Sequence, residues 1–340
     1  MSILIGDIGG TKARLQLREQ GTIIKQSVYP SQSYSGLVPM IQEFFRDADL
    51  HDKINKKPDA MCLALAGPVF NQADNQTVTM TNLSWSCNTN TLRHQLAIDN
   101  IFFINDLQAA AYGLQEVNDF DVITLQTGNV VENAPKLLIG IGTGFGQSFL
   151  VHQEGFSQAF SSEAGHKNFA PSNRFSQDLY HSLCSALANN ESTITVESLL
   201  SSKGLYKIYR YLCEHTELCP SAVMKDEMES QVPASVITHH AEYHQPLAEK
   251  TVGHYVELLG GYAGNAALSC LPTGGIYIMG GVATHILPWL QSSFFIDAFL
   301  DKGVMSNLLQ EIPIHVVTTD NLGLMGASQI VGKLFGSKKS

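Results

Sequence analysis

The sequence predicts an α/β protein of two domains in which one α/β unit occurs twice. Its 340 residues exceed a single domain of roughly 150 residues and leave room for two hydrophobic cores. A glycine-rich turn between short apolar segments occurs at residues 6–11 and again at residues 140–146. Further apolar segments alternate with stretches of helical periodicity, as they do in α/β folds. Two turns of similar design, so far apart in the chain, indicate a duplicated unit.

Each glycine-rich turn joins a pair of predicted strands. Residues 3–5 form a short apolar segment before the first turn, and apolar residues then alternate with polar ones over residues 13–18. This alternation predicts a half-buried strand. The second turn lies between residues 137–139 and 147–151, which repeat the arrangement.

Fully apolar segments between the two turns predict strands that are buried on both faces of a sheet. These segments are residues 61–66 and 101–104. Apolar side chains recur at helical spacing over residues 107–114, so Asn105 and Asp106 lie where a strand ends and a helix begins. Open α/β sheets bind ligands at that edge.

The C-terminal half of the chain is expected to begin with helices, over residues 175–271. Apolar segments at residues 276–279 and near 314–318 predict two more strands. A final helix is expected from about Gly323 onward.

Composition excludes several classes of protein. The 31 acidic and 21 basic residues give a net charge of −10, whereas nucleic-acid binding requires a basic face. No apolar run approaches the roughly 18 residues of a membrane-spanning helix, and no basic leader precedes the first strand. The 6 cysteines include no C-x-x-C pair and indicate neither a zinc site nor a disulfide framework. We therefore expect a cytoplasmic protein that binds neither nucleic acid nor membrane.

The glycine-rich turns are candidates for phosphate binding, because glycine lets the backbone approach a ligand and point its N–H groups at phosphate oxygens. Neither turn has the G-x-x-x-x-G-K-[S/T] spacing, and Phe145 takes the position that G-x-G-x-x-G requires. One such hairpin alone could be a structural turn. Two of them, each with a threonine and one with Asp7, favour a nucleotide, and the Asp7 carboxylate suits a hydrated Mg²⁺ ion.

Asn105 and Asp106 have two interpretations. Both residue types are common N-caps of helices, which is the structural alternative. Asp106 is also placed to act as a general base that removes the proton from an attacking hydroxyl, as an aspartate does in phosphoryl transfer.

Glu163 and His166 are three residues apart, with small residues between them. The pair could bind the hydroxyls of a polyol, which need both donors and acceptors. Metal ligation is a second alternative that lacks a third ligand nearby, and a polar loop without function is the third.

In their order along the chain, these motifs resemble the bacterial glucokinases of the hexokinase and actin-like ATPase superfamily. The resemblance extends from about residue 3 to about residue 328, and its segments are weak singly but specific as an ordered set. The segments are residues 6–14, 80–85, 104–107, 142–146, 163–166, 169–171, 197–201, 204–205, 274–281 and 323–327.

The resemblance implies a duplicated actin-like, ribonuclease H-like ATPase fold with a cleft between two domains. The small domain would comprise residues 1–107 together with 325–340, and the large domain residues 108–324. Sugar and ATP would bind in the cleft. A homodimer is expected on the same basis.

The resemblance also implies roles for individual residues. Asp106 would be the base that acts on the 6-hydroxyl of glucose, and the sugar would be bound by Asn105, Asp106, Glu163, His166 and Glu197. ATP would be bound by Gly6, Asp7, Ile8, Gly9, Gly10, Thr11, Gly142, Thr143, Gly144, Gly280 and Gly281, with Asp7 holding Mg²⁺ through water.

The expected activity is therefore that of a glucokinase of glycolysis, which uses ATP and Mg²⁺ to make glucose 6-phosphate. A kinase for mannose, fructose or an N-acetylated amino sugar is the nearest alternative, because the sequence hardly reports hydroxyl geometry. A sugar-sensing protein without catalysis is an alternative of another class, and Asp7 with Asp106 argues for chemistry. Two departures from the family pattern are Lys12, where many relatives have asparagine, and residues 202–203, where Gly-Pro is usual.

Overall fold

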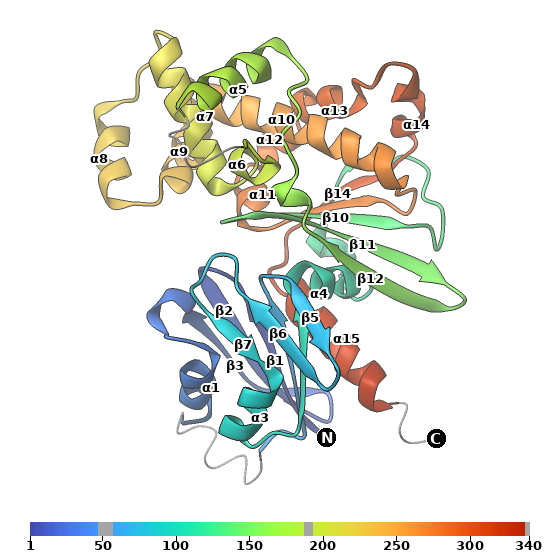
Figure 1. Ribbon diagram of the computed structural model, residues 1–340. Helices are drawn as coiled ribbons and strands as arrows, with labels where there is room; N and C mark the ends of the chain where they lie inside the picture. Colours follow the sequence, from blue (N-terminus) through green and yellow to red (C-terminus); the bar gives the residue numbers. More distant parts are fainter. Residues whose placement is uncertain (47–56, 187–192, 337–340) are drawn as a thin grey trace.

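The computed structural model describes residues 1–46, 57–186 and 193–336 of the chain. Figure 1 shows one β-sheet in the lower half of the molecule and another in the upper half, with most of the helices above the upper sheet. The N-terminal part of the chain forms the lower half, and the C-terminal helix returns to it.

The lower sheet has five strands in the order β3-β2-β1-β4-β8. The first three run antiparallel to their neighbours, whereas β4 and β8 run parallel to β1. The strands are β1 (Ser2–Ile8), β2 (Lys12–Glu19), β3 (Thr22–Pro30), β4 (Ala60–Leu65) and β8 (Asn100–Asn105).

The upper sheet has six strands in the order β12-β11-β10-β13-β14-β9. Here β10, β11 and β12 are antiparallel, β13 and β14 are parallel to β10, and β9 pairs antiparallel with β14. The strands are β9 (Val122–Gln126), β10 (Lys136–Ile141), β11 (Phe145–Gln153), β12 (Phe156–Ser162), β13 (Ile276–Met279) and β14 (Ile314–Val317).

The two sheets share one topology. In each, three antiparallel strands are followed by two parallel strands on the other side of the first strand, and β9 is an addition at the edge of the upper sheet. Both glycine-rich turns connect the first strand of their sheet to the second. The duplicated α/β fold that the two turns predict is thereby confirmed.

Helices cover both sheets and fill most of residues 174–270, as the periodicity predicts. No helix in the described parts of the chain is both long and apolar enough to cross a membrane. The α-helices are α1 (Leu37–Arg46), α3 (Thr89–Leu96), α4 (Asp106–Gly113), α5 (Arg174–Ala186), α6 (Val196–Leu199), α7 (Ser202–His215), α8 (Ala222–Ser230), α9 (Pro233–Glu242), α10 (Pro246–Cys270), α11 (Gly281–His285), α12 (Leu287–Leu290), α13 (Ser293–Leu300), α14 (Ser306–Gln310) and α15 (Leu322–Gly336).

The 25 residues of α10 form the centre of the upper hydrophobic core. The helix begins with Pro246 in its first turn, where proline is tolerated, and the Gln245 side chain accepts a hydrogen bond from Ala248 N–H at 2.7 Å. It ends where Leu271 adopts a left-handed conformation with a φ of 43°, one residue before Pro272. Its buried face packs against α7, α9 and α13.

Two helices pass from one half of the molecule to the other. α4 follows β8 of the lower sheet but packs on β10, β11 and β12, whereas α15 follows β14 of the upper sheet but packs on β1 and β4. The two helices also pack on each other, and a Cβ atom at Gly326 would lie 1.7 Å from the Ala109 carbonyl oxygen. The predicted domain limits, after residues 107 and 324, coincide with these crossings. The division into domains stays a prediction, and its residues 337–340 lie outside the described part of the chain.

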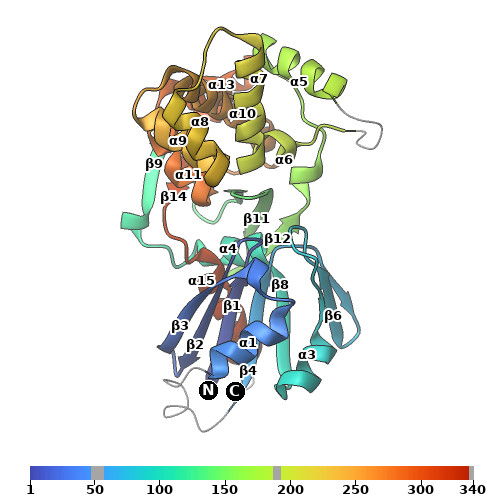
Figure 2. The same cartoon turned by 90° about the vertical axis from the view of Figure 1, so that its left-hand side faces the viewer.

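The alternation predicted for β2 is confirmed at Ala13, Leu15 and Leu17, which are buried, and at Arg14 and Arg18, which are partly exposed, but it is wrong at Gln16. Leu15, Gln16 and Leu17 are all buried, because helices cover both faces of the lower sheet. Leu4 of β1 packs in the cluster that includes α1, and the next residue, Ile5, packs in the cluster that includes α15. Figure 2 shows α1 in front of this sheet. The Gln16 amide stays hydrogen-bonded, since it donates to the Gln26 side chain at 2.6 Å.

Several strands carry no clear sequence signal. β3 and β9 lie at sheet edges and have no buried residue, and a separate three-stranded sheet follows β4. That sheet consists of β5 (Val69–Gln72), β6 (Asn75–Thr79) and β7 (Ser86–Asn88). The described part of the chain also contains four short 3₁₀ helices: η1 (Ser31–Ser33), η2 (Asp119–Asp121), η3 (Ala164–His166) and η4 (Gly303–Met305).

Candidate active site

A cavity of about 620 Å³ lies between the two halves of the molecule and is lined by residues from both sheets. Its position at the ends of strands that precede glycine-rich turns is where α/β folds bind ligands. Most of the residues proposed from the sequence meet there. They are Gly9, Gly10, Thr11, Asn105, Asp106, Gly142, Thr143, Gly144, Glu163, His166, Glu197, Gly280 and Gly281.

The structure does not bring Gly6, Asp7 and Ile8 to the cavity wall. Gly6 lies within β1, where a Cβ atom would be 2.7 Å from the Leu63 side chain, and Ile8 is fully buried in the lower core. Asp7 is half-buried beside Arg14, which does line the cavity. Of residues 6–11, only the turn itself, residues 9–11, lines the cavity, because the preceding residues belong to β1.

The two glycine-rich turns face each other across the cavity. Thr11 Oγ1 lies 3.0 Å from Thr143 Oγ1, so one hydroxyl donates to the other. Each turn is closed by a short backbone bond, from Gly9 N–H to Lys12 carbonyl at 2.9 Å and from Gly142 N–H to Gly144 carbonyl at 2.9 Å. One threonine hydroxyl from each half of the molecule is thereby placed at the same part of the cavity.

Gly280 and Gly281 form the cavity wall on the upper side, where β13 ends and α11 begins. Gly280 has a φ of 106°, and a Cβ atom there would lie 2.3 Å from the Ile141 carbonyl oxygen. Only glycine fits this position, which brings the backbone of α11 close to the second glycine-rich turn.

Asn105 is a helix N-cap, which is the structural interpretation of this residue given by the sequence. Its side-chain oxygen accepts a hydrogen bond from Gln108 N–H at 3.0 Å, which makes Asn105 the N-cap of α4. Its amide nitrogen donates to the Gly67 carbonyl at 3.2 Å. One amide hydrogen is left for a ligand in the cavity.

Asp106 is a half-buried carboxyl at the first position of α4. Burial raises its pKa to about 7, and the negative charges of Asp7 and, less strongly, Glu163 act in the same direction. Backbone hydrogen bonds, including one from Leu107 N–H at 2.8 Å, oppose these effects. A carboxyl with a pKa near neutrality in a cavity is suited to accept a proton from a substrate hydroxyl.

Burial also raises the pKa of Asp7, to about 6, with Asp320 adding to the rise and Arg14 opposing it. The Arg14 guanidinium lies 3.8 Å from the Asp7 carboxylate and forms a hydrogen bond to Asp320. Gly323, in the first turn of α15, would place a Cβ atom 2.7 Å from the Asp7 carboxyl carbon. The start of α15 therefore packs directly on this acid.

Glu163 and His166 lie together on the rim of the cavity, with 4.0 Å between Glu163 Oε2 and His166 Nε2. Both side chains are about half exposed, at 52% and 53%. In the described residues, no three His, Cys, Asp or Glu side chains gather as metal ligands would. The arrangement leaves a donor and an acceptor free to face a ligand.

Glu197 is held from the neighbouring hairpin. Its Oε2 atom accepts a hydrogen bond from Phe145 N–H at 2.8 Å, and a Cβ atom at Gly144 would lie 2.7 Å from the same oxygen. Thr195 caps α6 and so fixes the helix that carries Glu197. The second glycine-rich turn thus lies between the residues predicted to bind ATP and those predicted to bind the sugar. Thr143 faces the first turn, and Gly144 lies against Glu197.

Sequence reasoning assigned no role to several other residues that line the cavity. Lys12 and Arg14 follow the first turn, and Ser202 donates its N–H to the Gly142 carbonyl at 2.9 Å, which fixes the loop that departs from the family pattern. Gly67 directly follows the apolar segment at residues 61–66, and that position could have indicated it. Thr81 and Asn82 follow β6, which carries no clear sequence signal, and the residues at and before α9 carry none either. The residues that also line the cavity include Ala66, Gly67, Thr81, Asn82, Val232, Ala234, Ser235, Thr238, Val282 and His285.

Comparison with known proteins agrees with this geometry. The family model described as Glucokinase matches residues 4–333. A glucokinase of Nostoc sp. is 37% identical over 349 residues, covering 98% of this chain and 99% of the relative.

Solved structures agree as well. A glucokinase from an Antarctic psychrotroph is 26% identical, with a TM-score of 0.74 over 98% of this chain and 99% of that one. A ROK family glucokinase from Streptomyces griseus, in complex with glucose and AMPPNP, is 18% identical, with a TM-score of 0.67 over 97% of this chain and 99% of that one. The family model and the Nostoc relative cover nearly the whole sequence, and the chain therefore belongs to the glucokinase family.

Proposed function

We propose that the protein transfers the γ-phosphoryl group of ATP to the 6-hydroxyl of glucose, with Asp106 as the general base. The observation that carries the proposal is a carboxyl with a pKa of about 7 in a cavity that also holds two facing glycine-rich turns. Phosphoryl transfer requires a positioned base and a cradle for phosphate oxygens more than it requires covalent catalysis. The glucokinase relatives support glucose as the acceptor.

The phosphates of ATP are proposed to bind between residues 9–11 and 142–144, with Gly280 and Gly281 near the adenosine. Thr11 and Thr143 would turn their hydroxyls, now 3.0 Å apart, toward the phosphate oxygens. The complex of the Streptomyces griseus relative with AMPPNP supports a nucleoside triphosphate as the donor.

Glucose is proposed to bind next to these turns, among Asn105, Asp106, Glu163, His166 and Glu197. This set supplies acceptors and donors in roughly the mixture that a polyol needs. The bond from Phe145 N–H holds Glu197 in one orientation before the sugar arrives, which lowers the entropic cost of binding.

In the proposed reaction, the Asp106 carboxylate takes the proton of the 6-hydroxyl as that oxygen attacks the γ-phosphorus. A bond forms between the sugar oxygen and phosphorus, and the bond from phosphorus to the oxygen shared with the β-phosphate breaks. ADP leaves with that oxygen, and Asp106 later releases its proton to solvent. Closure of the cleft over the sugar would exclude water and suppress hydrolysis of ATP.

Mg²⁺ is proposed as the metal, and Asp7 fits it. The Asp7 carboxyl has a raised pKa because it is buried and lies near Asp320, and a divalent cation would favour its charged form. The ion would neutralise phosphate charge when bound. Asp7 would hold it through water, since the residue lies behind the cavity wall.

The first experiment measures ADP release from ATP and Mg²⁺ with a panel of hexoses, together with an Asp106→Asn variant. We expect release with glucose above all other sugars, and a loss of kcat of about 10²-fold to 10⁴-fold in the variant with a Kd for glucose within a few-fold of the wild type. Asp119→Asn, at an exposed acid in η2, is the matched control and should be unaffected.

Each other outcome selects an alternative. Release with mannose, fructose or an N-acetylated amino sugar would keep the mechanism and change the substrate. Sugar binding without ADP release, from folded protein, would favour a sugar-sensing protein. Equal loss of binding and turnover in Asp106→Asn would make Asp106 a binding residue.

We also propose that residues 1–107 with 325–340 and residues 108–324 are the two domains, and that the protein is a cytoplasmic homodimer that acts in glycolysis. The six cysteines are all free, which suits a reducing compartment. Light scattering during gel filtration tests the dimer, since the chain mass is 37.1 kDa and a dimer has twice that mass.

A further inference from the structure

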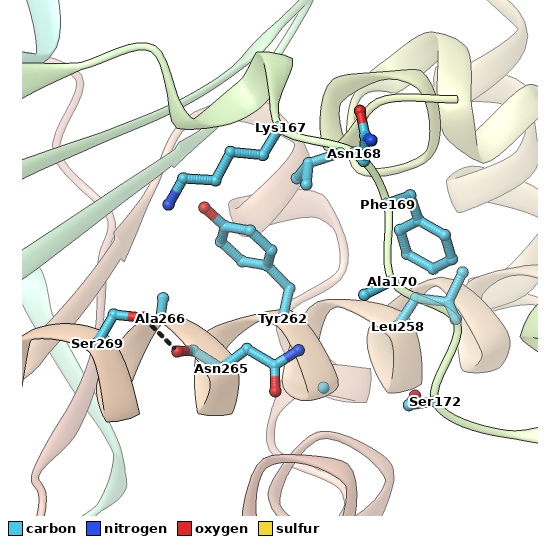
Figure 3. Close-up of a pocket in the computed structure, with 12 residues that line it drawn as sticks. Lys167, Asn168, Phe169, Ala170, Ser172, Leu258, Tyr262, Asn265, Ala266 and Ser269 are labelled. Carbon is cyan, nitrogen blue, oxygen red and sulfur yellow. Dashed lines mark hydrogen bonds between the residues drawn. The ribbon is translucent and has the colours of Figure 1, made fainter. Parts of the chain in front are cut away.

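A second cavity, of about 220 Å³, lies behind the proposed sugar site in the upper half of the molecule. It is formed by the loop that follows η3 and by the C-terminal part of α10. Figure 3 shows this loop above the cavity and α10 below it, with the Tyr262 ring rising from the helix between them. The cavity is separate from the central one, because the two share no lining residue.

The two cavities nevertheless lie on opposite sides of the same chain segments. His166 lines the central cavity, whereas the next residue, Lys167, lines the second one. In the same way Glu197 lines the central cavity, and Val196 before it lines the second. The segments are joined, because Val196 N–H donates to the Lys167 carbonyl at 2.9 Å.

Tyr262 provides another connection between the cavities. Its ring lines the second cavity and packs edge-on against Phe145, with 4.9 Å between the ring centres. Phe145 N–H is the donor that holds Glu197 at 2.8 Å. The Tyr262 hydroxyl donates to the buried Gln147 side chain at 2.6 Å, which fixes the ring on β11.

The chemistry of the wall indicates the ligand. Among the described residues, Lys167 is the one charged side chain that lines the second cavity and no acid lines it, although the whole chain carries a net charge of −10. Within the described parts of the chain, the Lys167 ammonium forms no ion pair. Figure 3 shows this side chain reaching over the cavity toward the hydroxyl end of Tyr262.

The rest of the wall combines neutral polar groups with an apolar floor. Asn168 and Asn265 offer amides, and Phe169 and Leu258 are buried apolar side chains. The volume of about 220 Å³ is below the range of roughly 300 to 1,000 Å³ that drug-sized ligands occupy. A fitting ligand is therefore small, with one negative group and an apolar body.

We propose that this second cavity binds a small organic anion at Lys167, and that the bound anion strengthens glucose binding through the two joined segments and Tyr262. The anion would restrict the motion of the loop that begins at Lys167. Because His166 and Glu197 are adjacent in sequence to Lys167 and Val196, their positions in the central cavity would be restricted as well. The coupling part of the proposal depends on the proposed sugar site, whereas the binding part does not.

The binding part is tested by calorimetric titration of the sugar-free protein with benzoate, with neutral benzamide as the matched probe. We expect one saturable site for benzoate and binding of benzamide weaker by about tenfold, as loss of a charged hydrogen bond predicts. Lys167→Met should weaken benzoate by a similar factor. Lys250→Met, at an exposed lysine on α10 outside the cavity, should not weaken it.

Three results would overturn the site: no saturable benzoate binding, equal binding of benzamide, or unchanged binding to a folded Lys167→Met variant. The first would mean that the cavity is empty or covered by other protein, the second that charge plays no part, and the third that benzoate binds elsewhere.

The coupling part is tested by titrating glucose with and without saturating benzoate. We expect glucose to bind about fivefold more tightly with benzoate, and benzoate to bind more tightly by the same factor with glucose, because linkage is reciprocal. In Gln147→Leu, which removes the hydrogen bond to the Tyr262 hydroxyl at a residue that lines neither cavity, the factor should fall toward one while benzoate still binds. Unchanged glucose affinity would overturn the coupling. Absence of any glucose binding would instead contradict the proposed function, and the benzoate titration alone would still decide the site.

Discussion

The proposed role of Asp106 as a base requires a carboxylate that is partly buried in the cavity. Burial of this carboxylate in its charged form lowers the free energy of unfolding. Its pKa is raised from 3.8 to about 7, so the folded protein holds the proton more tightly than the unfolded chain. The stability that this proton provides is present in full at low pH and is lost as the pH rises through about 7. Above that pH the buried charge destabilises the fold.

The variant Asp106→Asn should therefore be more stable than the wild type at pH 8, by on the order of 2 kcal/mol after allowance for partial exposure. The advantage should shrink as the pH falls from about 7 toward 3, where the wild-type carboxyl is mostly neutral in both the folded and the unfolded state. Thermal unfolding at several pH values measures the difference. A variant that is less stable at pH 8 would mean that the carboxylate is stabilised in the fold and has an ordinary pKa.

The residues of the site were predictable where a short sequence pattern around them indicates their role. Asp106 follows a buried strand and Gly142 lies in a glycine-rich turn, and both patterns are visible in the sequence. Asn105 illustrates the limit, because one side chain caps α4 and also lines the cavity, so the two interpretations were never exclusive. The contact of Glu197 with Phe145 N–H was not predictable, because it joins residues 52 positions apart through packing.

At the scale of an element, the second glycine-rich turn has two glycines with different roles. A Cβ atom at Gly144 would meet Glu197 Oε2 at 2.7 Å, whereas a Cβ atom at Gly142 would meet nothing within 4 Å. Gly144→Ala should therefore displace Glu197 from Phe145 N–H and weaken glucose binding by about tenfold or more. Gly142→Ala should leave glucose binding unchanged. Calorimetry without nucleotide measures both, and equal effects would show that the turn acts only through its flexibility.

The crossing of α4 and α15 depends on close approach of two helix backbones. Gly326→Ala would place a Cβ atom 1.7 Å from the Ala109 carbonyl oxygen, so the helices must separate. We expect a loss of about 3 kcal/mol or more in the free energy of unfolding. Gly332→Ala on the same helix meets nothing within 4 Å and should gain up to about 1 kcal/mol from helix propensity. Urea unfolding compares them, and equal stability of the two variants would contradict this packing.

Elements with strong periodicity were predictable, and those defined by pairing were not. β4 and β8 are continuous apolar runs because helices cover both faces of the lower sheet. β9 has no such run, since it lies at the edge of the upper sheet and exists through its pairing with β14. Alternation in β2 predicted burial correctly except at Gln16, which is buried with its amide bonded to Gln26.

At the scale of the whole molecule, the exchange of α4 and α15 makes each half depend on the other. α4 carries Asp106 from the lower sheet onto the upper one, and α15 begins against Asp7 and packs on the lower one. The two glycine-rich turns, which belong to different sheets, meet at Thr11 and Thr143. A rotation of one half against the other about the crossing helices would thus change the cavity without unfolding either sheet.

We therefore expect glucose to close the two halves on each other, because Asp106 and Asn105 come from one sheet and Glu163, His166 and Glu197 from segments on the other. Small-angle X-ray scattering should record a decrease in the radius of gyration of about 1 Å on saturation with glucose. Gly144→Ala, at a glucose concentration that saturates only the wild type, should show no decrease. If glucose binds fully and the scattering curve stays the same, the cavity is rigid, and exclusion of water must then come from the sugar itself.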